Sequence, residues 1–194
     1  MSTSQAAALT FKDYKSGTKP IWCPGCGDFA VLNAITKALA ILQLPLENVA
    51  LVSGIGCSSR IAAYTSVYGF HGVHGRALPL AAGLKAARKD LTVLAAGGDG
   101  DGLSIGGNHF IHACRRNMDL TYIMMDNEVY GMTKGQASPT TPMDWDHSKL
   151  TPHGPGVRPF KPAALALAAG APWIARAYSG TPNQMARLIA GAGE

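Results

Sequence analysis

The stretch LTVLAAGGDGDGLSIGG, residues 91–107, joins a mostly apolar run to a glycine-rich segment that carries two aspartates. The run 91–96 predicts a buried strand, and the residues beyond the glycines predict a helix over 105–116. Backbone N–H groups at the start of a helix point towards bound anions, and glycine lets an anion approach the backbone closely. The stretch therefore indicates an α/β fold with an anion site where this strand ends.

Outward from this stretch, predicted helices alternate with predicted strands in both directions. Strands are expected at 49–53, 91–96, 120–126 and 173–177, and helices at 28–42 (capped by Asp28), 78–89, 105–116, 162–169 and from 182 onward. This alternation predicts an α/β fold with a mostly parallel sheet and helices on both faces. A single domain is expected to span 1–194, with a long proline-rich loop at about 138–162.

Charge and hydropathy exclude several classes of protein. Seventeen Lys and Arg against twelve Asp and Glu give a net charge of +5, and the basic residues are scattered, which argues against nucleic-acid binding. No apolar run approaches the roughly 20 residues of a membrane span, and the first residues do not resemble a secretory signal. We therefore expect a cytoplasmic protein whose four cysteines stay reduced and serve metal binding or core packing.

The glycine-rich segment does not fit the dinucleotide pattern GxGxxG, because counting from Gly98 puts Leu103 at the last glycine position. Two aspartates beside an anion site favour a Mg²⁺ ion that bridges a diphosphate. The segment DNEVYGMTKGQ, 126–136, follows the next predicted strand. Because parallel strands end at the same edge of a sheet, Asp99 and Asn127 can reach one metal ion.

The order GDG, helix, strand and Asn resembles the fingerprint of thiamine diphosphate enzymes. With further stretches it is similar to the β subunits of 2-oxoacid:ferredoxin oxidoreductases, particularly the 2-oxoglutarate type. The matching stretches cover about residues 20–142 in order, and they are WCPGCG, GIGCSSR, HGVHGRALPLAAGLKAA, GGDGDGLSIGGNH and DNEVYGMTKGQASPTT.

The resemblance implies a thiamine diphosphate-binding fold and an enzyme that oxidises 2-oxoglutarate with coenzyme A. The products would be succinyl-CoA, CO₂ and reduced ferredoxin, and the reaction could run in reverse. A partner α subunit would supply the catalytic glutamate, because none of Glu47, Glu128 and Glu194 is well placed. The expected assembly is an (αβ)₂ heterotetramer.

The resemblance also assigns roles to individual residues. Mg²⁺ would be held by Asp99, Asn127 and the backbone carbonyl of Val129. Independently of the resemblance, Arg60 and Lys134 are the best candidates to bind substrate carboxylates through charge-assisted hydrogen bonds, because both lie on loops at the ends of strands. The remaining expected cofactor contacts lie on the same loops, and they are Gly56, Cys57, Ser58, His74, Gly98, Gly100, Asp101, Gly131 and Thr133.

By the same resemblance, Cys23, Cys26 and Cys57 are three ligands of a [4Fe–4S] cluster. Cys114 falls inside a predicted helix, where core packing is expected. In the family the fourth ligand comes from a later Ser-Pro-Cys segment that this sequence does not contain. We therefore expect a sequence truncated at its C-terminus, or a ligand from another segment.

Two alternatives stay open on the sequence alone. The same fold could act on pyruvate or on a broad range of 2-oxoacids. The three cysteines, completed by His71 or His74, could instead bind zinc in a non-catalytic α/β scaffold module.

Overall fold

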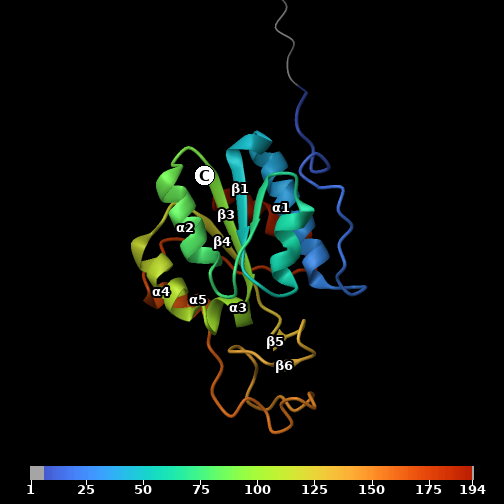
Figure 1. Ribbon diagram of the computed structural model, residues 1–194, viewed down its shortest axis with the longest axis vertical. Coiled ribbons are helices and arrows are strands. Elements are labelled where there is room, and N and C mark those ends of the chain that lie inside the picture. The colour runs from blue at the N-terminus through green and yellow to red at the C-terminus, as the bar shows by residue number, and fades with distance from the viewer. Residues whose placement is uncertain (1–6, 194) are drawn as a thin grey trace, which may run out of the picture.

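The computed structural model describes residues 7–193, and its centre is a four-stranded parallel sheet (Figure 1). The strands lie in the order β2-β1-β3-β4. Their bounds are β1 Val49–Ser53, β2 Tyr68–His71, β3 Thr92–Gly98 and β4 Thr121–Met125. β2 pairs with one side of β1, and the next strand along the chain, β3, pairs with the other side of β1. In open parallel sheets, ligands bind at such a switch point, beyond the carboxyl ends of the strands.

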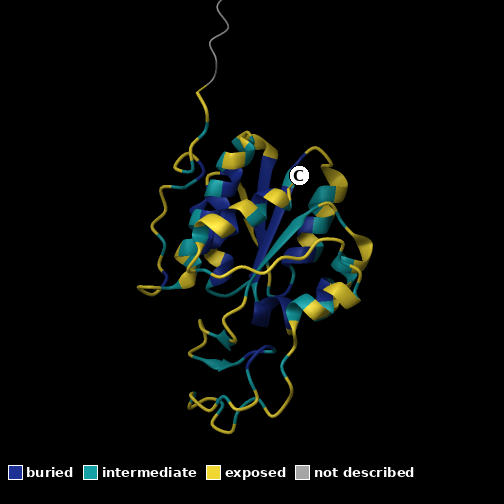
Figure 2. Ribbon diagram, turned by 180° about the vertical axis from the view of Figure 1, so that it is seen from behind, coloured by how far each residue is buried: buried dark blue, intermediate teal, exposed yellow. Residues whose placement is uncertain are grey.

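Helices cover both faces of the sheet, as the sequence predicts. In β1, Leu51 packs against one face, with α1 (Gly27–Leu42), the 3₁₀ helix η2 (Ser58–Tyr64) and α6 (Pro182–Gly191). Its neighbours Ala50 and Val52 pack against the other, with α2 (Ala77–Ala87), α4 (Gly107–Arg116) and α5 (Pro162–Ala168). The central strands are buried between these layers (Figure 2). This arrangement confirms the α/β prediction.

The strand register brings several chain segments to one edge of the sheet. Ser53 of β1 lies opposite His71 of β2 and Ala96 of β3, and Gly98 of β3 lies opposite Met125 of β4. The short helix α3 (Asp99–Leu103) begins at this edge. So does a hairpin of β5 (Val129–Tyr130) and β6 (Gln136–Ala137), which projects beyond the strands (Figure 1).

The strands of the structure differ from the predicted strands in two places. No strand forms at 173–177 in the described chain, where Trp173 and Ile174 are exposed, because an apolar run becomes a strand only when it pairs with a sheet edge. The sheet instead contains β2, a strand of only four residues, YGFH, which is too short to be predicted from its pattern and whose residues are all exposed. The 3₁₀ helix η1 (Leu46–Asn48) precedes β1.

The helix boundaries also need correction. Asp28 does not cap α1: Cys26 takes the N-cap position, and Asp28 lies in the first turn, where its charge complements the helix dipole. The glycine-rich segment is itself helical, since α3 starts at Asp99 and is separated from α4 by a turn at 104–106. Residues 138–161 contain neither helix nor strand. Among the described helices, none has the length and apolar character required to cross a membrane.

Candidate metal and cofactor site

Asp99 lies at the centre of the carboxyl edge, where β3 turns into α3, and its side chain is buried. The side-chain amide of Asn127 donates hydrogen bonds to Asp99 Oδ1 at 3.2 Å and to the carbonyl oxygen of Val129 at 2.8 Å. The Asp99 carboxylate, the Asn127 amide and the Val129 carbonyl therefore converge on one point, and an amide that turns over presents its oxygen there instead of its nitrogen. A carboxylate, an amide oxygen and a backbone carbonyl are the ligands that Mg²⁺ takes in proteins. The donor set therefore fits the predicted ion.

The second oxygen of Asp99 is held by hydroxyl groups that sequence reasoning missed. Ser138 Oγ donates to Asp99 Oδ2 through a short hydrogen bond, and Thr140 Oγ1 donates to the same oxygen at 2.6 Å. The sequence gives only a weak signal for them, because SPTT (138–141) opens a segment that reads as an irregular loop. Both residues are buried, which distinguishes them from ordinary loop residues.

The Asp101 carboxylate joins three loops at this edge. Its Oδ1 accepts hydrogen bonds from the backbone N–H groups of Ile55 (2.9 Å) and Gly75 (2.7 Å) and lies 2.9 Å from His74 Nδ1. Within the described chain its buried Oδ2 has no hydrogen-bond partner. The side chain thus fixes the loops after β1 and β2 against α3, and His74 is bound to this carboxylate.

Close approach of these groups depends on glycine. A Cβ on Gly54 would overlap the Asp101 carboxylate, and one on Gly100 would overlap the ring of Tyr130, whose hydroxyl donates to the Gly100 carbonyl at 3.2 Å. Gly56 adopts φ +121°, a conformation open mainly to glycine. Local backbone requirements therefore explain much of the glycine content of these loops.

Buried charge perturbs a neighbouring phenol. Burial raises the pKa of Tyr122, and the negative charges of Asp101 and Asp99 raise it further. Tyr122 therefore stays protonated beside the two carboxylates.

Other predicted contacts lie on the same edge. Ser58 is buried, with its Oγ 3.1 Å from the position that a Cβ on Gly98 would occupy. Gly131 lies beside Asn127 and Cys57, since a Cβ there would be 3.7 Å from Asn127 Nδ2 and 3.9 Å from Cys57 Sγ. The Thr133 hydroxyl donates within its hairpin, to Gln136 Oε1 at 2.6 Å.

The two predicted substrate cations are exposed and make no salt bridge in residues 7–193. Arg60 lies on η2, near enough to Cys57 that its positive charge acts to lower the pKa of that thiol. Lys134 lies in the hairpin with φ +80°. Both are available to bind an anion.

The predicted cluster ligands are neighbours without forming a metal site. Burial raises the thiol pKa of Cys26 and Cys57, and the charge of Asp28 raises both further. Cys23 is exposed, and it acts electrostatically on Cys57. Over residues 7–193, no three His, Cys, Asp or Glu side chains converge closely enough to hold a metal ion.

Cys114 lies apart from these cysteines, as its helical position predicts. It packs in α4 with the core cluster on one face of the sheet, whereas Cys26 and Cys57 pack with the cluster on the opposite face. The proposed zinc histidines have other contacts: His71 Nδ1 lies 2.9 Å from the Ser59 carbonyl, and His74 is bound to Asp101.

Two of the three glutamates lie within the described residues. Glu47 lies in η1, before β1 and therefore at the amino edge of the sheet. Glu128 is exposed with φ +60°, and Glu194 lies outside the described residues.

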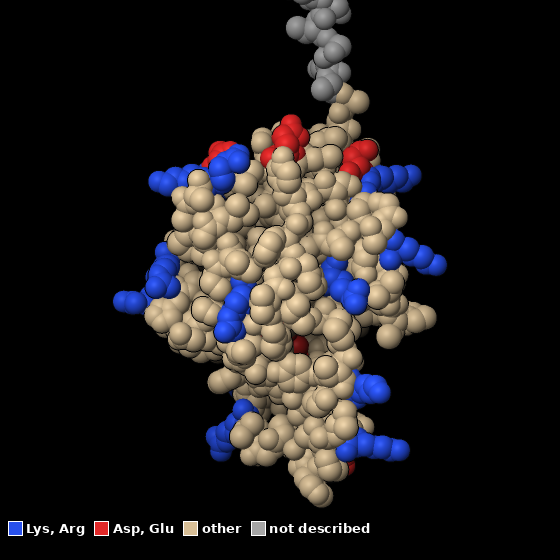
Figure 3. Space-filling view, viewed as in Figure 1, with Lys and Arg blue, Asp and Glu red and all other residues tan. Residues whose placement is uncertain are grey.

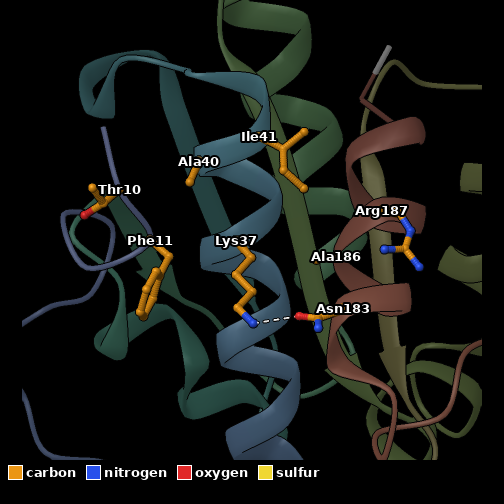
Figure 4. Close-up of a pocket in the computed structure, with 8 residues that line it drawn as sticks. All are labelled: Thr10, Phe11, Lys37, Ala40, Ile41, Asn183, Ala186 and Arg187. Atoms are coloured by element: carbon orange, nitrogen blue, oxygen red, sulfur yellow. Dashed lines mark hydrogen bonds between the residues drawn. The ribbon is translucent and has the colours of Figure 1, made fainter. Parts of the chain in front are cut away.

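Two further features of the surface are a pocket and the distribution of basic side chains. A shallow pocket between the N-terminal segment, α1 and α6 (Figure 4) is lined by none of the predicted site residues; its lining is Thr10, Phe11, Lys37, Ala40, Ile41, Asn183, Ala186 and Arg187. Lys and Arg side chains are distributed over the visible face without forming one patch (Figure 3).

Comparison with known proteins identifies the family of the chain. Residues 54–193 match the family model for the thiamine pyrophosphate enzyme, C-terminal TPP binding domain. The chain is 48% identical over 183 residues to 2-oxoglutarate oxidoreductase subunit KorB of Mycobacterium tuberculosis, covering 94% of this chain and 49% of that protein. It is 46% identical over 183 residues to 2-oxoacid:ferredoxin oxidoreductase 2, subunit beta, of Aeropyrum pernix, covering 94% and 59%.

A solved structure, the 2-oxoglutarate:ferredoxin oxidoreductase from Magnetococcus marinus with 2-oxoglutarate, coenzyme A and succinyl-CoA bound, is similar with a TM-score of 0.93 and 46% sequence identity. The similarity covers 95% of this chain and 63% of that one. The chain thus spans between about half and two thirds of the length of these relatives. It belongs to the thiamine pyrophosphate enzyme family through its TPP-binding domain, and the relatives compared with it are named as 2-oxoglutarate and 2-oxoacid oxidoreductases or their subunits.

Proposed function

We propose that this chain is the thiamine diphosphate- and [4Fe–4S]-binding β subunit of a 2-oxoglutarate:ferredoxin oxidoreductase. The enzyme converts 2-oxoglutarate and coenzyme A to succinyl-CoA and CO₂, passes the electrons to ferredoxin, and can run in reverse. The observation that carries this proposal is the convergence of the Asp99 carboxylate, the Asn127 side-chain amide and the Val129 carbonyl at the switch point of the sheet. The names of the relatives support the choice of substrate.

The residues of this chain hold the cofactor in place. Asp99, Asn127 and the Val129 carbonyl would hold Mg²⁺, which would anchor the diphosphate, and the backbone N–H groups of Gly100 and Asp101 would be donors for that diphosphate. When bound, thiamine diphosphate supplies the carbanion chemistry that breaks the bond between the carboxylate and the carbonyl carbon. The buried Asp101 carboxylate keeps the loops after β1 and β2 in position around it.

The cysteines Cys23, Cys26 and Cys57 supply thiolates to the cluster. Support comes from their nearness to one another and from the position of Cys57 beside Gly131, on the loop that also carries Asn127. A fourth ligand comes from another segment. A partner α subunit supplies the glutamate, since Glu47 lies at the opposite edge of the sheet and Glu128 is exposed. The two subunits form an (αβ)₂ heterotetramer.

The exposed cations Arg60 and Lys134 select the substrate. A charge-assisted hydrogen bond contributes about 1.5–3 kcal/mol, so losing one costs roughly ten- to a hundred-fold in affinity. Replacing Arg60 or Lys134 with Ala should therefore raise KM for 2-oxoglutarate far more than KM for pyruvate.

The test is a substrate panel on the chain purified with its α subunit. Coenzyme A-dependent reduction of ferredoxin should be faster with 2-oxoglutarate than with pyruvate, and the preparation should contain thiamine diphosphate, Mg²⁺ and equal amounts of iron and acid-labile sulfide. Equal kcat/KM for both acids would replace this proposal with a broad 2-oxoacid enzyme. Zinc in place of iron, with no activity, would replace it with a scaffold module.

A further inference from the structure

The two oxygens of the Asp99 carboxylate have different surroundings. Oδ1 faces the side-chain amide of Asn127 at 3.2 Å, whereas Oδ2 receives both the Ser138 and the Thr140 hydroxyl. Ser138 is 6% exposed, Thr140 5% and Asp99 1%, so water does not compete for these hydrogen bonds. Oδ2 is thus held by two buried hydroxyls, whereas Oδ1 faces one amide, which can turn to present its oxygen when a cation binds.

The segment that carries these hydroxyls is itself held firmly. The hairpin pairs Val129 with Ala137, which returns the chain to the loop after β4. Thr141, 1% exposed, donates its hydroxyl to the Glu128 carbonyl at 2.5 Å and accepts the Ser138 N–H at 2.7 Å. Residues 138–141 are therefore fixed to the same loop that carries Asn127.

Thr140 also connects Asp99 to a second carboxylate. Its Oγ1 lies 2.6 Å from Asp99 Oδ2 and 2.8 Å from Asp126 Oδ1. A hydroxyl has one hydrogen, so it can donate to only one of the two carboxylates at a time. A cation at Asp99 Oδ1 would reduce the negative charge that the two carboxylates share, so the ion and the hydroxyl arrangement stabilise each other.

We propose that Ser138 and Thr140 are positioning residues for the metal: their hydroxyls hold Asp99 Oδ2 so that Oδ1 is presented to Mg²⁺. This inference rests on the proposed function, because it requires Mg²⁺ at Asp99. Groups that orient a metal ligand typically change metal affinity 10–100-fold when they are removed. The segment 138–141 thereby belongs to the metal site, although it lies outside the thiamine fingerprint.

The test measures the dissociation constant of Mn²⁺, by the EPR signal of the free ion, on the full chain purified with its α subunit and saturated with thiamine diphosphate. Thr140→Val keeps the shape and removes the hydroxyl, and it should weaken Mn²⁺ binding about 10–100-fold. Thr140→Ser restores a hydroxyl and should stay within about threefold of wild type, a rescue that a purely packing role would not give. Ser138→Ala should weaken binding in the same range.

A matched control is Thr36→Val, which removes a buried hydroxyl in α1 that donates to the Leu32 carbonyl at 3.1 Å, far from the site. It should leave Mn²⁺ affinity unchanged while matching any general loss of stability, which circular dichroism during heating would measure. Unaltered Mn²⁺ affinity in Thr140→Val and Ser138→Ala would overturn the inference and leave the proposed function intact. A wild-type protein that binds no Mn²⁺ with thiamine diphosphate would overturn both.

Discussion

The Asp99 site and the cysteine segment differ in how far their side chains are buried and hydrogen-bonded. Asp99 is 1% exposed and has hydrogen-bonding groups at both oxygens, whereas Cys23 is exposed and Cys26 and Cys57 are half-buried. The carboxyl edge of a parallel sheet fixes the first site through strand register and buried hydrogen bonds. The second depends on an N-terminal loop, and soft-metal sites commonly gain their final geometry from the bound metal itself. The comparison suggests that diphosphate binding is preorganised and that cluster binding requires assembly.

The largest expected effect comes from removing the charge at the preorganised site. Asp99→Asn keeps the shape of the side chain but removes a formal charge from the Mg²⁺ ligands, so retention of thiamine diphosphate should fall more than about a hundredfold. Equilibrium dialysis with Mg²⁺ measures the affinity, and circular dichroism checks that the helices remain. Near-normal retention in a folded variant would remove Asp99 from the metal site.

A second substitution tests whether the edge is as tightly built as the comparison requires. In Gly54→Ala the added methyl group would overlap the Asp101 carboxylate, which should destabilise the fold by about 3 kcal/mol. Gly83→Ala is the control, since open space surrounds that position on α2 and alanine favours a helix by about 1 kcal/mol. Chemical denaturation measures both. Equal stabilities would mean that the loops at this edge rearrange freely.

A third substitution separates the two regions. Cys57→Ser removes one proposed cluster ligand but leaves the Asp99 oxygens untouched, so iron and acid-labile sulfide should fall to below about half while thiamine diphosphate binding stays near wild type. Elemental analysis and dialysis on the same sample give both values. Parallel loss of iron and thiamine diphosphate would show that the regions assemble as one unit. Full iron content would exclude Cys57 as a ligand.

The smallest effect should come from breaking the ion pair between Arg88 and Asp90, which lies on the surface. Arg88 donates two hydrogen bonds to Asp90, at 2.9 and 2.7 Å, and this lowers the pKa of Asp90 to about 2. Because the folded pKa lies below the unfolded value of 3.8, the pair stabilises the fold above about pH 4 and loses that effect as the pH falls towards 2.

Asp90→Asn should therefore lower Tm slightly at pH 6 and not at all at pH 2. A melting series in dilute salt measures the difference. A loss as large as that of Gly54→Ala, or one that persists at pH 2, would contradict the assignment of this pair as a weak surface interaction.

The sequence predicts the shared edge because strands that alternate with helices must end on one side. That rule alone is enough to bring Asp99 and Asn127 together. It cannot find Ser138 and Thr140, because their roles depend on a hairpin whose strands are two residues long. The predicted strand at 173–177 is wrong for a related reason: pairing, which a short apolar run does not reveal, decides strand formation.

Residue types also predict the chemistry of a site better than they predict which groups a side chain contacts. The second aspartate of GDGD reads as part of a cofactor loop, yet its side chain binds backbone N–H groups of two other loops. Only the fold shows that Gly54 leaves room for it. Cys114 could be separated from the other cysteines in advance because its position inside a helix is a local property.

The most direct test of the Asp99 site is anomalous diffraction from crystals grown with Mn²⁺ and thiamine diphosphate. The structure predicts one Mn²⁺ peak bound by Asp99 Oδ1, Asn127 Oδ1 and the Val129 carbonyl, at distances close to the roughly 2.0–2.1 Å of Mg²⁺. The Asn127 oxygen, and not its nitrogen, should face the ion. A peak elsewhere, or an Asn127 amide that donates to Asp99 with thiamine diphosphate bound, would contradict the assignment of these three oxygens as the metal ligands.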